Sequence, residues 1–253
     1  MIYNLYIKHK HFSLFELSIL IVLIIVLVCL LLPIIKRTQF TARKTACSSN
    51  LKQCVNALLL YGSNNNHQLC TYGNNYSGWY AQTGIAETLG FRISPHGRAP
   101  VTERPVTICP DIWINSPSKN SSQAYGAAWF IPQPDYIGLD CEKIIEFKTN
   151  KGQVVFLNNL PNLSDYVLLA DSAYTTSEKN NTLPGVQCIL FARKKTGGTS
   201  HFPRAISLRH HDEANIGYAD GHVGTTADRV DLLMRSKIGA YIDATGRRVT
   251  VTE

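Results

Sequence analysis

The sequence lacks the short motifs that identify many enzymes and metal-binding modules. It has no G-x-S-x-G nucleophile elbow, no P-loop and no H-E-x-x-H zinc motif. None of its seven cysteines forms a C-x-x-C pair, which argues against a zinc ribbon or a thioredoxin-like centre. Internal repeats and long low-complexity segments are also absent, so the chain does not read as a solenoid. These absences favour a non-enzymatic protein with an ordinary folded core.

Positive charge is present but is not concentrated. The net charge is +7, and the cations are scattered through Lys36–Lys52, Arg193–Lys195 and Arg247–Arg248. A nucleic-acid-binding domain usually gathers its cations on one face or element. We therefore expect no nucleic-acid partner and assign the charge to a surface that meets anionic lipid or acidic polysaccharide.

One long apolar run dominates the N-terminal part of the chain. The residues from Leu17 to Ile35 include no charged side chain, and a helix of that length spans about 28 Å, the thickness of a bilayer core. The run leads into a basic, helix-compatible stretch instead of a small-residue cleavage site, so we expect a retained membrane helix. Glu16 at its start needs a partner in lipid, and Pro33 predicts a kink or a melted turn.

The pattern after the membrane segment predicts an amphipathic helix. Gly62 and three asparagines then end it. We predict a basic leader at 1–11, a membrane helix at 12–35, a helical extension at 36–62 and a globular head at 63–253. Five side chains of the extension recur at helical spacing on one face: Cys47, Leu51, Cys54, Leu58 and Tyr61.

In the head, short apolar runs predict strands at Thr107–Cys109, Val154–Leu157 and Tyr166–Ala170. Asp220-Gly221 stands between the runs Ala214–Ala219 and His222–Thr225. It predicts a hairpin with a type I′ turn, since that turn needs positive φ at both central residues.

The start of the apolar run resembles the class III signal of type IV pilins and type II secretion pseudopilins. Phe12-Ser-Leu-Phe-Glu-Leu17 carries the resemblance. In that family a prepilin peptidase removes the leader before the Phe, and the new amine is methylated. The resemblance places cleavage between His11 and Phe12, although the family usually has Gly where this chain has His11. It also implies that Glu16 pairs with an N-terminal amine in a growing filament.

The head resembles a group of prepilin-like proteins from Planctomycetes and Lentisphaerae with a C-terminal H-x9-DG motif. Here the motif residues are His210, Asp220 and Gly221. Four further segments fit the same group: Cys47-Ser-Ser-Asn-Leu-Lys-Gln53, Cys109-Pro-Asp111, Ala124-Tyr-Gly126 and Leu169-Ala-Asp171.

The resemblance implies an α+β, pilin-like fold in which a long N-terminal helix packs on an antiparallel sheet with loop-rich insertions. It implies a non-enzymatic structural subunit of a type II secretion or type IV pilus-like system. Its partners would be other pilin-like subunits, the assembly machinery, the prepilin peptidase and membrane lipid. The chain would cross the inner membrane once, with its N-terminus in the cytoplasm and its head in the periplasm, and later reach a filament or the cell surface. A positive-inside count favours the opposite orientation, since Lys36, Arg37, Arg43 and Lys44 follow the helix.

Cysteines and carboxylates leave several alternatives open. Outside the membrane helix, an even number of cysteines favours an oxidising compartment with one or more disulfides, among fifteen full pairings of Cys47, Cys54, Cys70, Cys109, Cys141 and Cys188. We expect no cofactor. Calcium is the weaker alternative, with Asp212, Glu213 and Asp220 as candidate ligands. A transition-metal site would draw on the same three carboxylates together with His210, His211 and His222, which His201 could join. Adjacent strand residues such as His210 and His211 point to opposite faces, however, and cannot both ligate simply.

Two other functions compete with the filament subunit. His11 in place of Gly favours a permanently anchored periplasmic or surface binding module. In that module Trp79-Tyr80, Trp113 and Trp129 would hold a glycan or protein ligand. The dense histidines near Asp220 leave a metal-dependent hydrolase as the third alternative.

Overall fold

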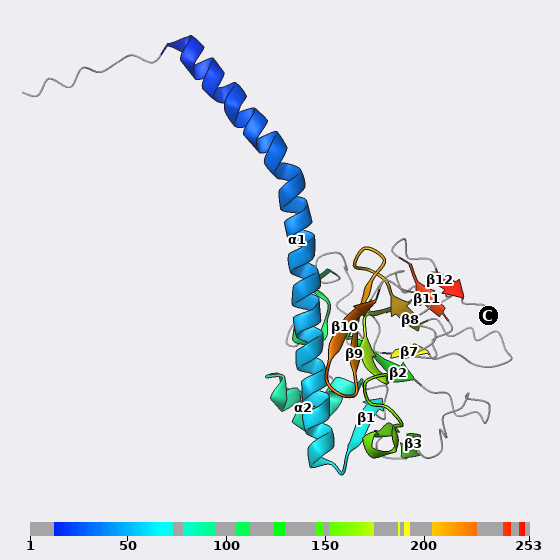
Figure 1. Ribbon diagram of the computed structural model, residues 1–253. Helices are drawn as coiled ribbons and strands as arrows, with labels where there is room; N and C mark the ends of the chain where they lie inside the picture. The colour runs from blue at the N-terminus through cyan, green and yellow to red at the C-terminus, as the bar shows by residue number, and fades with distance from the viewer. Residues whose placement is uncertain are drawn as a thin grey trace, which may run out of the picture. The chain divides into compact units, whose positions relative to one another are not determined.

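The computed structural model describes residues 13–72, 78–94, 105–111, 124–129, 145–148, 152–174, 187, 190–192, 204–226, 240–243 and 248–250. The predicted cleavage site at His11 and Phe12 lies outside these residues. The chain divides into two compact units, Met1–Ala42 and Arg43–Glu253. Helix α1, Leu14–Asn64, contributes residues to both (Figure 1).

Helix α1 begins with a capping box. The Ser13 hydroxyl accepts the backbone N–H of Phe15 at 3.2 Å, and the Glu16 carboxylate accepts the backbone N–H of Ser13 at 3.0 Å. Two of the amides that a helix start leaves unpaired are thereby satisfied. Glu16, which the sequence says needs a partner, has one within its own first turn.

The first part of α1 is apolar and exposed. It is the one helix among the described residues that is long and apolar enough to cross a membrane, and none of its most apolar window is buried by protein. The helix continues through Pro33, so the predicted melted turn is wrong. Proline removes one backbone N–H donor and crowds the preceding turn, but the helix extends on both sides of it. The other predicted alternative, a kink at Pro33, stays a prediction.

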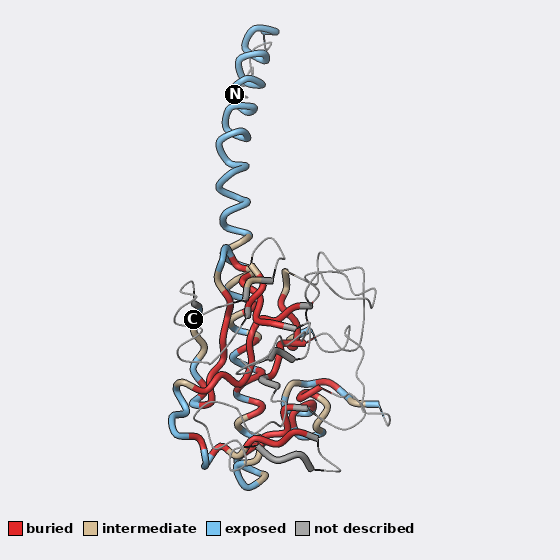
Figure 2. The backbone as a smooth tube through the Cα atoms, turned by 90° about the vertical axis from the view of Figure 1, so that its right-hand side faces the viewer, coloured by how far each residue is buried: buried red, intermediate tan, exposed pale blue. Residues whose placement is uncertain are grey.

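The later part of α1 has the predicted buried face. Cys47, Leu51, Cys54 and Leu58 are fully buried, and Tyr61 is partly buried. In Figure 2 the first part of α1 has the exposed colour, whereas buried backbone is drawn in the head. Val55, Ala57 and Gly62 broaden the buried stripe. The helix ends within two residues of the predicted end.

The head consists of short strands and helical turns in a loop-rich chain. Among the described residues, one short helix, α2 (Thr83–Thr88), and three 3-10 turns, η2 (Trp79–Ala81), η4 (Pro105–Thr107) and η5 (Leu157–Asn159), accompany the strands. The strands are β1 (Gln68–Tyr72), β2 (Gly126–Trp129), β3 (Ile145–Lys148), β4 (Gly152–Phe156), β5 (Val167–Ala170), β6 (Ser172–Tyr174), β7 (Leu190–Ala192), β8 (Arg204–Ser207), β9 (Ala214–Tyr218), β10 (Val223–Thr226), β11 (Ala240–Ile242) and β12 (Arg248–Thr250).

The strands form three sheets, in the orders β1-β4-β3, β10-β9-β5-β2-β7 and β12-β11-β8-β6. Most neighbours are antiparallel, which agrees with the predicted α+β class. Two pairs depart from the antiparallel pattern, since β2 pairs with β7 and β8 with β11 in parallel. Parallel neighbours need crossover connections. Here those connections contain other strands, since β3 to β6 lie between β2 and β7, and β9 and β10 lie between β8 and β11.

The head core forms where α1 meets the five-stranded sheet. A Cβ atom on Gly217 of β9 would lie 2.3 Å from Cγ2 of Val55 on the helix. Real Cβ atoms do not approach so closely, so the strand needs glycine there to reach the helix. Leu51, Leu58, Leu169 and Ile216 belong to the same core.

Two of the three predicted strands are confirmed. Val154–Leu157 overlaps β4, and Tyr166–Ala170 contains β5. The strand at Thr107–Cys109 is wrong, because Pro105 starts the 3-10 turn η4 there. Proline has the φ of a helical first turn, and short apolar runs do not distinguish a strand from a turn.

The β9–β10 hairpin is confirmed, but its turn type is not I′. Gly221 has a φ of +92°, whereas Asp220 is not among the residues with positive φ. Gly221 donates its N–H to the carbonyl of Tyr218, and Tyr218 donates to that of His222, both at 3.0 Å. This is the three-residue hairpin loop that ends in a left-handed glycine. Compared with a type I′ turn, this loop is one residue longer and needs a positive φ at one residue instead of two.

Candidate functional site

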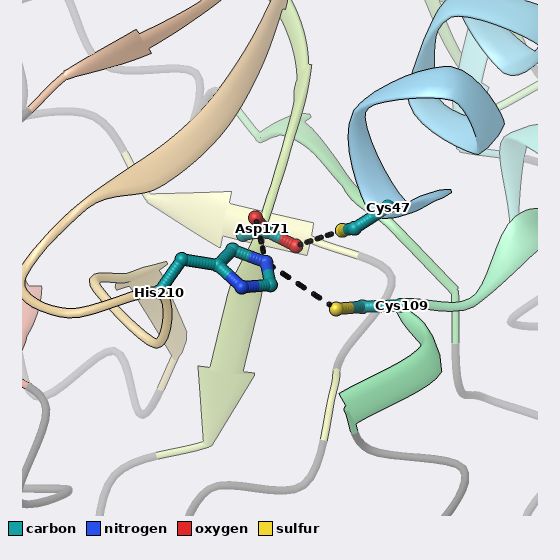
Figure 3. Close-up of side chains that lie close together, drawn as sticks. All are labelled: Cys47, Cys109, Asp171 and His210. Carbon is teal, nitrogen blue, oxygen red and sulfur yellow. Dashed lines mark hydrogen bonds and ion pairs between the residues drawn. The ribbon is translucent and has the colours of Figure 1, made fainter. Parts of the chain in front are cut away.

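Four side chains from distant parts of the chain meet inside the head. Ligand-type atoms of Cys47, Cys109, Asp171 and His210 all lie within 4.8 Å of one another, and all four residues are buried (Figure 3). We call them the buried cluster. The residues come from α1, from the segment after η4, from the β5–β6 junction and from the turn before β9.

Asp171 occupies the junction at which the chain leaves one sheet for another. It follows β5 of the five-stranded sheet and precedes β6 of the four-stranded sheet. Its backbone N–H donates to the carbonyl of Asn215 at 3.0 Å, and its carbonyl accepts the N–H of Ser207 at 2.9 Å. The N–H of Asn215 donates to its Oδ2 at 2.9 Å. These bonds fix a carboxylate with no solvent exposure at the meeting point of two sheets.

A tight turn directs His210 into the same place. His210 and Glu213 exchange backbone hydrogen bonds of 3.0 and 3.2 Å. The two residues between them, His211 and Asp212, have φ values of +53° and +62°. Two consecutive positive φ angles are the type I′ condition, met here by non-glycine residues at a cost of order 1 kcal/mol each. Strain of this kind persists where surrounding contacts hold it, as the contacts of His210 do.

The imidazole of His210 has an acidic partner at each nitrogen. Nδ1 lies 3.0 Å from Oδ2 of Asp111, and Nε2 lies 3.3 Å from Oδ2 of Asp171. Nε2 is also 3.5 Å from Sγ of Cys109. The ring is therefore held by Asp111 on one side and faces the buried cluster on the other.

The helix contributes Cys47 to the cluster. Its Sγ lies 3.3 Å from Oδ1 of Asp171 and 3.3 Å from the hydroxyl of Tyr125. That hydroxyl also donates to the backbone carbonyl of Cys47 at 3.0 Å. Trp79 in turn donates its indole N–H to the Tyr125 carbonyl at 2.8 Å. The aromatic pair thus holds this turn of α1 against the cluster.

Charges inside the cluster compensate one another. Burial alone raises the pKa of Asp171, but His210 and Arg209 outweigh it and hold that pKa below its ordinary value. The Arg209 guanidinium lies 4.0 Å from Oδ1 of Asp171 and donates to the carbonyl of Ser172 at 2.6 Å. Burial alone lowers the pKa of His210, but Asp111 and Asp171 raise it to about 11. Without other ligands the cluster therefore holds an imidazolium between two carboxylates.

The two thiols are influenced in opposite directions. Burial raises the pKa of Cys47 well above its ordinary value. Burial also acts to raise the pKa of Cys109, but hydrogen bonds from Cys47 and His210 lower it to about 7. A Cys–His–Asp series of this kind resembles a nucleophile with its base, yet Cys109 has no solvent exposure. Two thiols, an imidazole and a carboxylate are also suitable ligands for a metal ion.

All five head motifs quoted in the sequence contribute to this site or its support. Cys47, Cys109 with Asp111, Tyr125, Asp171 and His210 come from five separate motifs. Sequence reasoning identified the motifs but missed that they meet. The motifs stand far apart in the chain, and no spacing between them indicates the contact.

The far end of the H-x9-DG motif has a different environment. Asp220 and His222 form an exposed pair, with Nδ1 2.6 Å from Oδ1, and the His222 ring stacks on Tyr218 at 4.1 Å. Gly221 accepts a hydrogen bond from Lys52 of α1. His210 lies before β9, at the other end of that strand, and belongs to the buried cluster.

The calcium candidates do not assemble. Asp212 and Glu213 precede β9 and Asp220 follows it, and a five-residue strand separates its ends by roughly 17 Å. Glu213 instead forms an ion pair with Lys44 of α1. His201 lies outside the described residues.

The cysteines beyond the cluster are separate from it. Cys54 and Cys70 are buried. Cys54 donates to the carbonyl of Val106 at 3.4 Å, and Cys70 accepts from the amide of Gln82 at 3.1 Å. The other two disulfide candidates, Cys141 and Cys188, lie outside the described residues.

Trp79 and Tyr80, which were predicted to be part of a ligand-binding surface, are not exposed. Trp79 and Tyr80 are buried and pack edge to face at 5.9 Å. Their apolar area is needed in the core, which is the usual place for large aromatic rings. The side chains of Trp113 and Trp129 lie outside the described set.

Comparisons with family models, curated proteins and solved structures gave no match.

Proposed function

We propose that this chain is a non-enzymatic, membrane-anchored, pilin-like subunit that assembles with other such subunits. In this proposal the apolar part of α1 anchors the chain in the inner membrane with the head in the periplasm. After cleavage by a prepilin peptidase, the same segment packs against its neighbours in a filament of the type II secretion or type IV pilus kind.

The observation that carries the proposal is the contrast along α1. Side chains from Leu14 to Ile35 are about half exposed or more, whereas Cys47, Leu51 and Leu58 of the same helix are fully buried. An exposed apolar surface of this length needs lipid or other helices around it. A segment that serves both environments in turn is what a pilin-like subunit requires.

The position of Glu16 adds support. A carboxylate at the start of an apolar helix is costly in lipid unless it is paired. In the single chain it caps its own helix through the Ser13 amide. In an assembled bundle it would pair with the N-terminal amine of the neighbouring subunit and so set the register of the filament.

Glu16 variants separate this role from helix capping. Glu16→Val should insert into the membrane normally and fail to enter filaments, because it leaves the neighbour's amine unpaired. Glu16→Gln keeps an acceptor for the capping box but removes the charge. Both variants should fail to incorporate, as measured by membrane fractionation and by recovery in sheared filaments. Normal incorporation of Glu16→Gln would show that capping, and not charge pairing, is what assembly needs.

The processing step has its own direct measurement. Intact-mass and N-terminal peptide mass spectrometry on protein from its native membrane should show a chain that begins at an N-methylated Phe12. A chain that still begins at Met1 would retain a charged leader in the way of helix packing. That result would favour a permanently anchored protein over a filament subunit.

A further inference from the structure

The buried cluster has the ligand types and spacing of a tetrahedral metal site. We propose that Cys47, Cys109, Asp171 and His210 bind one divalent transition-metal ion of the zinc type. The site would lie inside the head, independent of whether the chain assembles into filaments. It was not found from the sequence because its ligands stand singly and in no spaced pair.

The distances between the ligand atoms support a tetrahedron. With zinc–sulfur bonds of about 2.3 Å and bonds to nitrogen or oxygen of about 2.0–2.1 Å, the edges of a tetrahedron are about 3.3–3.8 Å. The cluster has 3.5 Å from His210 Nε2 to Cys109 Sγ, 3.3 Å from that nitrogen to Asp171 Oδ2, and 3.3 Å from Cys47 Sγ to Asp171 Oδ1. These three distances, two of which end on different oxygens of Asp171, match tetrahedral edges, and all four ligand atoms lie within 4.8 Å of one another. Small side-chain movements would bring the four atoms around one central ion.

The orientation of His210 is that of a metal ligand. Its Nδ1 faces the Asp111 carboxylate at 3.0 Å, so Nε2 is the atom that faces the cluster. Metal-binding histidines usually hold their second nitrogen against a carboxylate or carbonyl, which fixes the tautomer and the ring plane. Asp111 supplies that outer contact and is itself 3.6 Å from Arg43.

The local charges balance around a dication. Two thiolates and the Asp171 carboxylate carry three negative charges, and a bound divalent ion leaves one. The Arg209 guanidinium, 4.0 Å from Asp171 Oδ1, compensates it. Binding releases the two thiol protons and the Nε2 proton of His210 to solvent, and no oxidation is involved.

Four protein ligands in a buried site indicate a structural role. Catalytic zinc sites keep one position open for water or substrate, whereas closed four-ligand sites stabilise the fold. The cluster residues have no solvent exposure or almost none. The ion would fasten α1, the segment after η4, the β5–β6 junction and the turn before β9 to one another.

The first test uses the wild-type full chain, purified in detergent under reducing conditions without chelator. We expect one zinc ion per chain by elemental analysis. X-ray absorption at the zinc edge should show two sulfur ligands and two nitrogen or oxygen ligands. Cobalt(II) in place of zinc should give the strong visible absorption of a tetrahedral site with thiolate charge transfer. No variant is needed for these measurements, so a folding defect does not affect them.

Matched cysteine variants then locate the site. Cys47→Ser and Cys109→Ser should each remove the cobalt–thiolate spectrum of the wild type, whereas Cys54→Ser and Cys70→Ser should keep it. All four thiols are buried, so general damage to the core affects both sets alike. Asp111→Asn should keep the spectrum and weaken zinc affinity about 10- to 100-fold, as outer-contact substitutions do.

Three outcomes would overturn the proposal. One is a reduced, folded chain that takes up neither zinc nor cobalt(II). Another is a zinc edge spectrum that contains only oxygen and nitrogen ligands, which would indicate an adventitious surface ion. The third is a Cys47–Cys109 disulfide in protein from its native membrane, detected by peptide mass spectrometry without reduction, since that bond would consume both sulfur ligands.

Discussion

Two histidine–aspartate pairs near opposite ends of β9 illustrate how solvent exposure changes the contribution of the same kind of contact to stability. His222 and Asp220 are closer, at 2.6 Å, but their side chains are 48% and 35% exposed. His210 and Asp171 are 3.3 Å apart and have no exposed side-chain surface. Water screens the first pair, whereas the second is held in a medium where an unpaired charge is costly. The longer contact should therefore be the more important one.

The largest expected effect comes from removing the buried carboxylate. Asp171→Asn should lower the free energy of unfolding by about 3 kcal/mol in the metal-free, reduced protein, because it leaves the charges of His210 and Arg209 under-compensated. The matched change Asp220→Asn in the exposed pair should cost less than about 1 kcal/mol. Urea unfolding of the full chain in detergent measures both. Equal losses for the two variants would contradict the comparison.

The strand between the two pairs should be nearly as sensitive. Gly217→Ala would place its Cβ atom 2.3 Å from Cγ2 of Val55. This overlap should destabilise the head by about 2 kcal/mol. Val55→Ala in the same chain should recover part of that loss by making room. Thermal unfolding of the two single variants and the double variant measures the coupling. Additive losses would show that the strand does not depend on this contact.

A smaller effect is expected at the edge of the buried cluster. Tyr125→Phe removes the hydroxyl that donates to the Cys47 carbonyl and should cost about 1 kcal/mol, the usual value of one buried hydrogen bond. Chemical unfolding beside wild type measures it. A loss as large as that of Asp171→Asn would mean that the hydroxyl, and not the charge network, holds α1 in place.

The smallest expected effect concerns the Lys44–Glu213 ion pair at the rim. Lys44 holds the pKa of Glu213 below its ordinary value. The pair therefore stabilises the head at neutral pH and loses its contribution as the pH falls through that lowered pKa. Glu213→Gln should cost less than about 1 kcal/mol at pH 7, and the difference from wild type should shrink in acid. Unfolding at both pH values checks the sign; a difference that grows in acid would contradict it.

The long-range part of the site could not be predicted from the sequence, although much of the local structure could. The buried stripe of Cys47, Leu51, Cys54 and Leu58 followed from helical spacing, and the β9–β10 hairpin followed from Asp220-Gly221. Both depend on neighbours in the chain. The turn type was wrong because Asp-Gly satisfies more than one hairpin loop.

The site itself depends on contacts between remote segments. Nothing in the spacing of Cys47, Cys109, Asp171 and His210 shows that they meet, because three sheets and their crossovers bring them together. The capping box of Ser13 and Glu16 is local by contrast, because it joins residues that are three apart in the chain. Burial of Trp79 could not be predicted from the sequence, because an aromatic pair suits a core and a ligand surface equally well.

The wide separation of the cluster residues also has a consequence for synthesis. Cys47 and Asp171 are 124 residues apart, and Cys109 and His210 are 101 apart. A chain that leaves the ribosome N-terminus first exposes α1 early and supplies the imidazole late. Until His210 has been synthesised, Asp171 lacks its imidazole partner, and burial of the unpaired carboxylate at the β5–β6 junction is unfavourable. A chain truncated before His210 should therefore fail to form the buried cluster.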